Sequence, residues 1–242
     1  MPAFPFSRHA WAAISVMSDP AVILSRYEGA FARTWAEETP VERVRFVAFD
    51  SESTGLDPVH DALVSLGAVA VQGGEILLDQ TFEALLKLQY NNAMVVIHGI
   101  TREESLKGRD EKEALLDFLD YLGDGVIVGH HIGHDVAMLN VALEKHFGTK
   151  LHNRTLDTME LTLHLEKAGM LPTADGEPDF TFDALCARFH IPPHDRHTAH
   201  GDAFLAAQLL LKLLRLAKRA GRGTLGGVCE PFHAVGAEEA EG

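Results

Sequence analysis

A short apolar run that ends in two carboxylates, between Phe46 and Leu56, constrains the fold of this chain more than any other stretch. Residues Phe46 to Phe49 form a near-continuous apolar run, which is typical of a strand buried on both faces. Asp50 and Glu52 follow at its end. Because side chains two positions apart on a strand share a face, about 6 to 7 Å apart, both acids can reach a cation between them. Taken alone, the pair is more simply interpreted as two solvated acids before a turn, so it needs further carboxylates to become a site.

The residues after this strand predict a hairpin. The segment from Ala62 to Val71 is apolar and contains several valines, which favour strands. The pair Gly73 and Gly74 then offers a tight turn into a second run, Glu75 to Phe82. We therefore expect three adjacent antiparallel strands, and the first of them carries the two acids.

The second half of the chain alternates helices with short strands. Thr101 and Glu104 have the spacing of a capping box that opens a helix. Further strands are expected at Val126–Val128 and Arg154–Thr158, and helices at Glu111–Leu122, from Asp135 onward, at Met159–Lys167, at Phe182–Phe189 and over about 20 residues from Ala199. This order predicts an α/β fold in which a mixed sheet, with three antiparallel strands and then parallel strands, is flanked by helices.

The chain divides into three parts on this interpretation. With 242 residues, it is long enough for one well-buried domain with peripheral segments at both ends. The parts are an N-terminal helical accessory segment at 1–42, the α/β domain at 43–220 and a flexible, Gly- and Glu-rich tail at 221–242.

A helix is expected in the accessory segment from Pro20 to Glu38. Its aromatic residues Tyr27, Phe31 and Trp35 recur every four positions and would lie on one helical face. We expect this face to dock on the domain, and a role in binding a partner is the alternative.

The net charge of −14 argues against a general basic surface for nucleic acid. Clustered carboxylates, however, attract divalent cations, and these can bind phosphate in turn. Overall charge therefore does not decide the function. Basic residues gather before the first strand and near the C-terminus, where solvated strand flanks and helix faces are the ordinary interpretation; they are Arg43, Arg45, Lys212, Arg215, Lys218, Arg219 and Arg222.

No stretch approaches the roughly 20 apolar residues of a membrane span, and the N-terminal residues lack the clear basic start of a signal peptide. Cys186 and Cys229 are the two cysteines, and they have no CxxC spacing. Reduced thiols are therefore expected. These features predict a cytoplasmic protein that makes no membrane contact.

Four acids are expected at the ends of helices and strands: Asp50 and Glu52 after a strand, Asp135 at one helix start and Asp202 at another. Crowded carboxylates raise each other's pKa, so a stable cluster needs cations. Two Mg²⁺ or Mn²⁺ ions suit an all-oxygen site, and such a pair, about 4 Å apart, can activate water and stabilise a leaving oxygen. His197, just before the last long helix, is then the candidate general base. For Asp135 alone, a favourable interaction with the helix dipole is an equal explanation.

Three segments of the sequence resemble the motifs of a known family. The segments FDSESTGL, VGHHIGHD and HTAHGDA, in this order and spacing, look like the three motifs of the DEDDh exonucleases, a family that includes the proofreading epsilon subunit of bacterial DNA polymerase III. The segments IHGIT, LDTMEL and FDALCARF are also similar to segments of that family. The resemblance covers roughly Arg45 to Lys218, and it depends on the ordered set of motifs because each is weak alone.

The resemblance implies an RNase H-like fold and metal-dependent hydrolysis of nucleic acid from the 3′ end to nucleoside 5′-monophosphates. It implies that one metal ion is held by three acids, that a second is bridged by the first of them and supported by a fourth, and that a histidine is the general base. The terminal nucleotide would be gripped by the segment after the first motif, with its leucine against the base. In this chain the first metal ion would be held by Asp50, Glu52 and Asp202, and the second would be bridged by Asp50 and supported by Asp135. The general base would be His197. The segment that grips the nucleotide would be Ser53, Thr54, Gly55 and Leu56.

The chain departs from the family pattern at a few positions. Ser53 replaces the commoner Thr, His131 stands where Asn is common, and His134 stands where Phe usually precedes the acid. These changes concern substrate fit more than metal binding. We expect turn or packing roles for His131, for His134 and for their neighbour His130, and a metal-ligand role is the lesser alternative. His200 fits the general-base spacing less well than His197.

Several readings of the function stay open at this stage. A proofreading or repair exonuclease that prefers single-stranded DNA is the leading prediction, with a polymerase as a candidate partner. The alternatives are an exoribonuclease of the same fold and an exonuclease-like module that binds nucleic acid or a partner without turnover. Some relatives form homodimers, so a homodimer is a further alternative for this chain.

Overall fold

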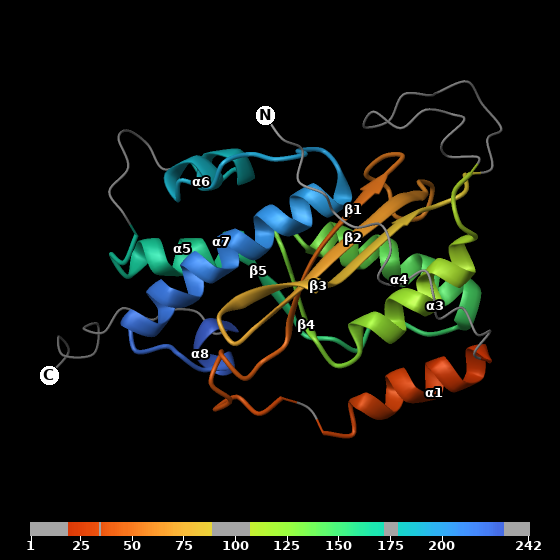
Figure 1. Ribbon diagram of the computed structural model, residues 1–242, viewed down its shortest axis with the longest axis horizontal. Helices are drawn as coiled ribbons and strands as arrows, with labels where there is room; N and C mark the ends of the chain where they lie inside the picture. The colour runs from red at the N-terminus through yellow and green to blue at the C-terminus, as the bar shows by residue number, and fades with distance from the viewer. Residues whose placement is uncertain (1–18, 34, 89–106, 172–178, 230–242) are drawn as a thin grey trace, which may run out of the picture.

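A five-stranded mixed sheet forms the centre of the structure, a computed structural model that describes residues 19–33, 35–88, 107–171 and 179–229 (Figure 1). The strands are β1 Phe46–Ser53, β2 Leu63–Gln72, β3 Glu75–Leu85, β4 Val126–Gly129 and β5 Thr155–Asp157. Their order is β3-β2-β1-β4-β5; the pairs β3-β2 and β2-β1 are antiparallel, and β1-β4 and β4-β5 are parallel. The predicted sheet is thereby confirmed. The capping box expected at Thr101 and Glu104 lies outside the described residues.

Helices cover both faces of the sheet (Figure 1). Side chains of β1 alternate between two cores: Phe46 and Ala48 join one, and Val47 and Phe49 join the other. The first core contains residues of α5 Thr158–Lys167, α6 Phe182–Arg188, α7 Ala199–Arg219 and α8 Leu225–Cys229, and the second contains residues of α1 Pro20–Ala30, α3 Glu111–Leu122 and α4 Gly133–Phe147. The same alternation directs the acids of β1 toward the α7 face of the sheet.

Strand β1 is longer than the apolar run predicts. It continues through the acids to Ser53, and there Asp50 pairs with Gly67 of β2 and Glu52 pairs with Ser65. On its other side, β4 pairs only with residues 46–48 of β1. Among the strands that the structure describes, none covers this second edge along the acidic half of β1, and side chains from elsewhere can approach it there.

Helix α7 lies close to the sheet beside Asp50 because Gly67 has no side chain. A Cβ atom at Gly67 would lie 2.2 Å from the carbonyl carbon of Ala199 and from the nitrogen of His200. The first turn of α7 is also capped, since the Thr198 hydroxyl accepts a hydrogen bond of 3.2 Å from the Gly201 nitrogen. These two features bring the start of α7 over β1 and β2.

The N-terminal helix α1 ends at Ala30, so the helix predicted to Glu38 is too long. Tyr27 and Phe31 pack edge to face, 5.2 Å apart, and the Tyr27 hydroxyl donates a hydrogen bond of 2.6 Å to Asn153 Oδ1. Trp35 lies beyond the helix, and its Nε1 donates to the backbone oxygen of Asp124 at 2.8 Å. The three aromatics do not share a helical face, because Trp35 packs against the opposite core, although all three contact the domain.

Residues 221–229, which the sequence assigns to a flexible tail, belong to the folded part. Helix α8 buries Leu225 and Val228 in the first core. The Leu225 nitrogen donates to the Thr39 oxygen at 2.8 Å, and the Gly226 nitrogen donates to the Glu37 oxygen at 2.9 Å. Two apolar side chains in a Gly-rich segment are enough to dock it, which composition alone does not reveal.

Two of the basic residues have structural roles. The Arg45 guanidinium donates to the backbone oxygens of Tyr121 and Leu122 at the end of α3, at 3.0 and 2.9 Å, and Lys218 pairs with Glu42. Cys186 and Cys229 do not form a disulfide with each other. Among the helices that the structure describes, none has the length and the apolar character needed to cross a membrane.

Candidate active site

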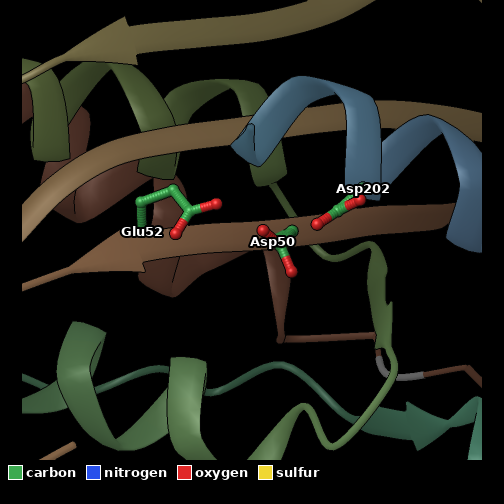
Figure 2. A group of neighbouring side chains, drawn as sticks. All are labelled: Asp50, Glu52 and Asp202. Atoms are coloured by element: carbon green, nitrogen blue, oxygen red, sulfur yellow. The ribbon is translucent and has the colours of Figure 1, made fainter. Parts of the chain in front are cut away.

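Three of the predicted acids meet at the start of α7 (Figure 2). Asp50 and Glu52 share the α7 face of β1 because they are two positions apart, and Asp202 comes from the first turn of α7. One carboxylate oxygen of each lies within 4.8 Å of the others, and Glu52 and Asp202 are only 8% and 7% exposed. A buried, all-oxygen donor set of this kind fits a divalent cation such as Mg²⁺ or Mn²⁺.

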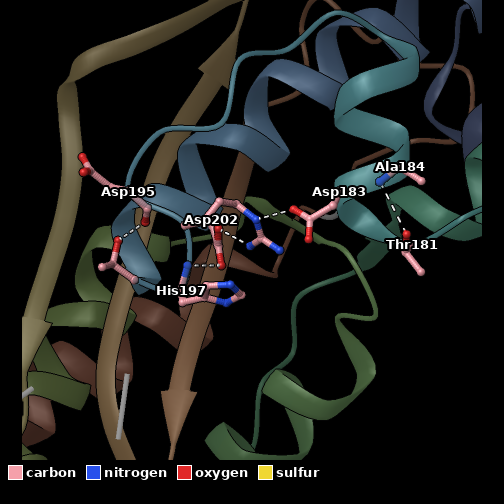
Figure 3. A network of polar contacts seen from close by, with 8 residues as sticks. Thr181, Asp183, Ala184, Asp195, His197 and Asp202 are labelled. Carbon is pink, nitrogen blue, oxygen red and sulfur yellow. Dashed lines mark hydrogen bonds and ion pairs between the residues drawn. The ribbon is translucent and has the colours of Figure 1, made fainter. Parts of the chain in front are cut away.

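Asp202 is held in place from two sides (Figure 3). Its Oδ2 accepts a hydrogen bond of 3.2 Å from the His197 nitrogen, and its Oδ1 forms an ion pair of 2.5 Å with Arg196 Nη1. The carboxylate is thus oriented by the loop that precedes its own helix.

Asp135 lies beside this group and not within it. It comes from α4, on the opposite face of the sheet, and is 7% exposed. Its Oδ1 accepts hydrogen bonds from the Ser51 nitrogen at 2.9 Å and from the Ser51 hydroxyl at 2.7 Å. Asp135 therefore occupies the uncovered edge of β1, next to Asp50, where it could support a second ion.

Burial raises the pKa of three of these acids, and neighbouring carboxylates add to the shift at Asp50 and Glu52. Burial and then the charges of Asp135, Asp202 and Glu52 hold the pKa of Asp50 well above its usual range. Burial and then the charge of Asp202 raise the pKa of Glu52 to about 7. Burial also raises the pKa of Asp135, although its bonds to Ser51 oppose the shift. Cations would remove this repulsion, so the charges support the metal-binding interpretation.

Replacing Glu52 with Gln is expected to stabilise the metal-free protein at neutral pH. Because the pKa of Glu52 is raised from 4.5 to about 7 by folding, its ionised form favours the unfolded chain. The free energy of unfolding of the wild type therefore falls as pH rises through this window. We expect Glu52→Gln to exceed the wild type by about 2 kcal/mol above about pH 7, allowing for screening by water in the open site, and by little near pH 4.5.

The measurement is urea unfolding with a chelator present, at several pH values across that window. Glu75→Gln, at an exposed residue of β3, is the matched control and should leave the wild-type curve unchanged. An equal pH dependence in the wild type and in Glu52→Gln would contradict the assignment of the charge repulsion to Glu52.

His197 faces the three acids from the loop between α6 and α7. It lines a cavity of about 230 Å³ together with Asp50, Glu52 and Asp202. His200, the other candidate base, instead forms an ion pair of 3.5 Å with Glu83 of β3. The structure therefore brings His197 into the acidic site, while His200 has its partner at the edge strand.

The predicted nucleotide-gripping segment, Ser53 to Leu56, follows β1 directly. Thr54 Oγ1 donates to Asp61 Oδ1 at 2.9 Å, and a Cβ atom at Gly55 would lie 2.4 Å from Asp61 Oδ2. Leu56 is 85% exposed, so its side chain is available to a ligand. Asp61 thus organises this segment. Asp61 was not predicted as a site residue, and its place just before the second strand was the one signal for it in the sequence.

The histidines of the second motif have turn and packing roles. His130 stacks on Phe182 with ring centres 5.0 Å apart, and burial lowers the pKa of His130 to about 4, so it is neutral. His131 takes a positive φ of 57°, and its nitrogen donates to Asp157 Oδ1 at 3.2 Å. His134 lies in the first turn of α4. These contacts are of the turn and packing kind, and His130 also lines the cavity that contains Asp50, Glu52 and Asp202.

Arg196 is a residue of this site that the sequence analysis missed. It lines the same cavity as His197, and its Cζ lies 5.0 Å from the centre of the Phe182 ring. Its position directly before the candidate base was the available signal. The contact between this basic side chain and the cluster of acids can be recognised only from the three-dimensional structure.

Comparisons with known proteins agree with this geometry. The family model described as "Exonuclease", RNase T type, matches residues 47–210, more than half of the chain. The chain is 33% identical over 187 residues to the PolC-type DNA polymerase III of Bacillus subtilis and 29% identical over 191 residues to that of Thermotoga maritima. These matches cover 75% and 78% of the chain but only 12% and 13% of the two relatives.

Among solved structures, E. coli Exonuclease I in complex with a dT13 oligonucleotide is similar with a TM-score of 0.62 and 17% identity, over 74% of this chain and 43% of that one. The zinc-bound form of the E. coli Exonuclease I complex with single-stranded DNA has a TM-score of 0.60 and 14% identity, over 73% and 41%. At these identities the likeness concerns the fold, and it confirms the predicted RNase H-like architecture.

Proposed function

The chain belongs to the RNase T-type exonuclease family, and from this premise we propose that it removes nucleoside 5′-monophosphates from the 3′ end of single-stranded nucleic acid. The observation that carries the proposal is the convergence of Asp50, Glu52 and Asp202, within 4.8 Å, beside His197. A family member that had lost turnover would be expected to lack at least one of these side chains.

Each side chain has a part in the proposed reaction. Asp50, Glu52 and Asp202 would hold one divalent ion, and Asp50, with support from Asp135 directly or through water, would hold a second. Such ions would lower the pKa of a water molecule and neutralise the charge that develops on the leaving oxygen. His197 accepts the proton of the attacking water. Ser53, Thr54, Gly55 and Leu56 bind the terminal nucleotide, with backbone donors toward its sugar or phosphate and Leu56 against its base.

DNA is the proposed substrate in preference to RNA. The similar PolC-type proteins are named as DNA polymerases, and the similar E. coli Exonuclease I is bound to deoxyoligonucleotides. By the same reasoning we propose a proofreading or repair role and a polymerase as partner. The cytoplasmic location stays a prediction from the sequence, and a homodimer stays an alternative.

The test is a paired digestion of 3′- and 5′-labelled single-stranded DNA and RNA of equal sequence, with Mg²⁺, with Mn²⁺ and with a chelator. We expect mononucleotides from the 3′ end of DNA, more slowly from RNA, and none with the chelator. Asp202→Asn, which keeps the shape of the carboxylate but not its charge, should abolish release. Faster release from RNA would favour the exoribonuclease alternative. A folded protein that binds Mn²⁺ and the strand but cleaves neither polymer would favour the binding module.

A further inference from the structure

Arg196 joins Asp202, one of the clustered acids, to Asp183 of helix α6. Its Nη1 pairs with Asp202 Oδ1 at 2.5 Å, and its Nε donates to Asp183 Oδ1 at 2.7 Å. Phe182, the neighbour of Asp183, lies against the guanidinium at 5.0 Å. The Arg196 side chain is 19% exposed, whereas the Asp183 side chain is 69% exposed. The guanidinium is thus fixed between one buried and one solvated carboxylate.

The loop that carries Arg196 is strained on either side of it. Asp195 and His197 have positive φ angles of 47° and 62°, which residues other than glycine adopt at a cost. The Thr198 hydroxyl donates to the Asp195 oxygen at 2.5 Å, and the His197 nitrogen donates to Asp202. Arg196 lies between these two strained residues, and its side chain is anchored at Asp183 and Asp202.

We propose that Arg196 is a positioning residue of the exonuclease site, which holds Asp202 and the His197 loop in the reactive arrangement and competes with the metal ion for the Asp202 carboxylate. This inference rests on the proposed function. The Arg196 guanidinium then lowers the affinity of the site for the metal ion and raises the rate of turnover. Its charge weakens the attraction of the site for a cation, and its contacts fix the groups that act on the substrate.

Arg196→Gln should therefore bind Mn²⁺ about fivefold more tightly and turn over substrate at least about tenfold more slowly. The KM for single-stranded DNA should change little, because Arg196 acts through Asp202 and His197 and not on the substrate. Asp183→Ala removes only the solvated contact of Arg196. It should lower kcat in the same direction by a smaller factor, with the Mn²⁺ affinity close to that of the wild type.

The experiment combines three measurements on the full chain: Mn²⁺ affinity by calorimetric titration, kcat and KM for release of mononucleotides, and thermal unfolding. Arg154→Gln is the matched control. Arg154, the residue before β5, pairs with Glu37 of the N-terminal segment through two contacts, at 2.6 and 3.2 Å, and its loss should leave all the site measurements unchanged.

A higher Mn²⁺ affinity together with a lower kcat in Arg196→Gln supports the proposal, since a simple loss of structure would lower both quantities. A fall in both quantities overturns it, and so does a raised KM at unchanged kcat, which would place Arg196 on the substrate. If the wild type releases no nucleotide, the proposed function fails separately. The Mn²⁺ affinity of Arg196→Gln then decides the competition with the metal ion, and an affinity equal to or lower than that of the wild type overturns it.

Discussion

Asp50→Asn is expected to lower kcat at least about 10³-fold while leaving the chain folded. Asp50 lies between Glu52, on the same strand face, and Asp202 of α7 (Figure 2), and Asp135 is the neighbouring charge that raises its pKa most. It is the acid proposed to contact both ions, so its loss weakens the two sites together. Asn has the same shape and keeps one oxygen, so the backbone pairing of Asp50 with Gly67 should persist.

The measurement pairs kcat for mononucleotide release with thermal unfolding in the presence of a chelator. Because burial and neighbouring acids disfavour the ionised Asp50 side chain, the metal-free variant should unfold at the same or a higher temperature than the wild type. Asp79→Asn, at an exposed residue of β3, should retain full activity. A kcat within tenfold of the wild type for Asp50→Asn would show that Asp50 does not hold the ion.

Local patterns were enough to predict much of the fold. The helix at Glu111–Leu122 and the start of the long helix at Ala199 have the predicted bounds. In both, an apolar stripe with helical spacing is preceded by a capping side chain, and these signals are contained in the segment itself. The hairpin turn was equally local, because Gly73 and Gly74 both take positive φ.

Features that depend on distant partners could not be predicted in this way. Strand β1 runs on through polar residues because β2 pairs with them, and an apolar run cannot show that. Trp35 departs from the expected helical face because its side chain donates a hydrogen bond to the backbone oxygen of Asp124, which is 89 residues away in the sequence. Helix α8 forms because Leu225 and Val228 reach the core formed by other helices.

The candidate site shows the same division. The period of a strand places Asp50 and Glu52 on one face, and that prediction needed only their spacing. The different position of Asp135 follows from topology, because α4 covers the opposite face and its side chain reaches β1 through Ser51. The place of Arg196 in the site could be recognised only from the contacts between its loop and α6.

His197→Gly is expected to lower kcat by about 10²- to 10⁴-fold, the range for loss of a general base. Glycine is the informative substitution here because His197 has a positive φ of 62°, which glycine adopts without strain. The hydrogen bond from the backbone nitrogen to Asp202 is retained, since it does not involve the side chain. The variant should therefore keep the loop, the acids and the Mn²⁺ affinity of the wild type, and lose only the imidazole.

Added imidazole provides the decisive measurement, because it can enter the space that the side chain leaves and accept the proton in its place. We expect it to restore part of the lost kcat in His197→Gly and to have no effect on the wild type. His200→Ala removes a histidine of the same loop-helix junction that pairs with Glu83 instead, and its kcat should stay within about twofold of the wild type. If His200→Ala were the slower variant, or if imidazole restored its activity and not that of His197→Gly, the proton would pass to His200. The reaction would then have to be assigned to the β3 side of the acids, because that is where His200 meets Glu83.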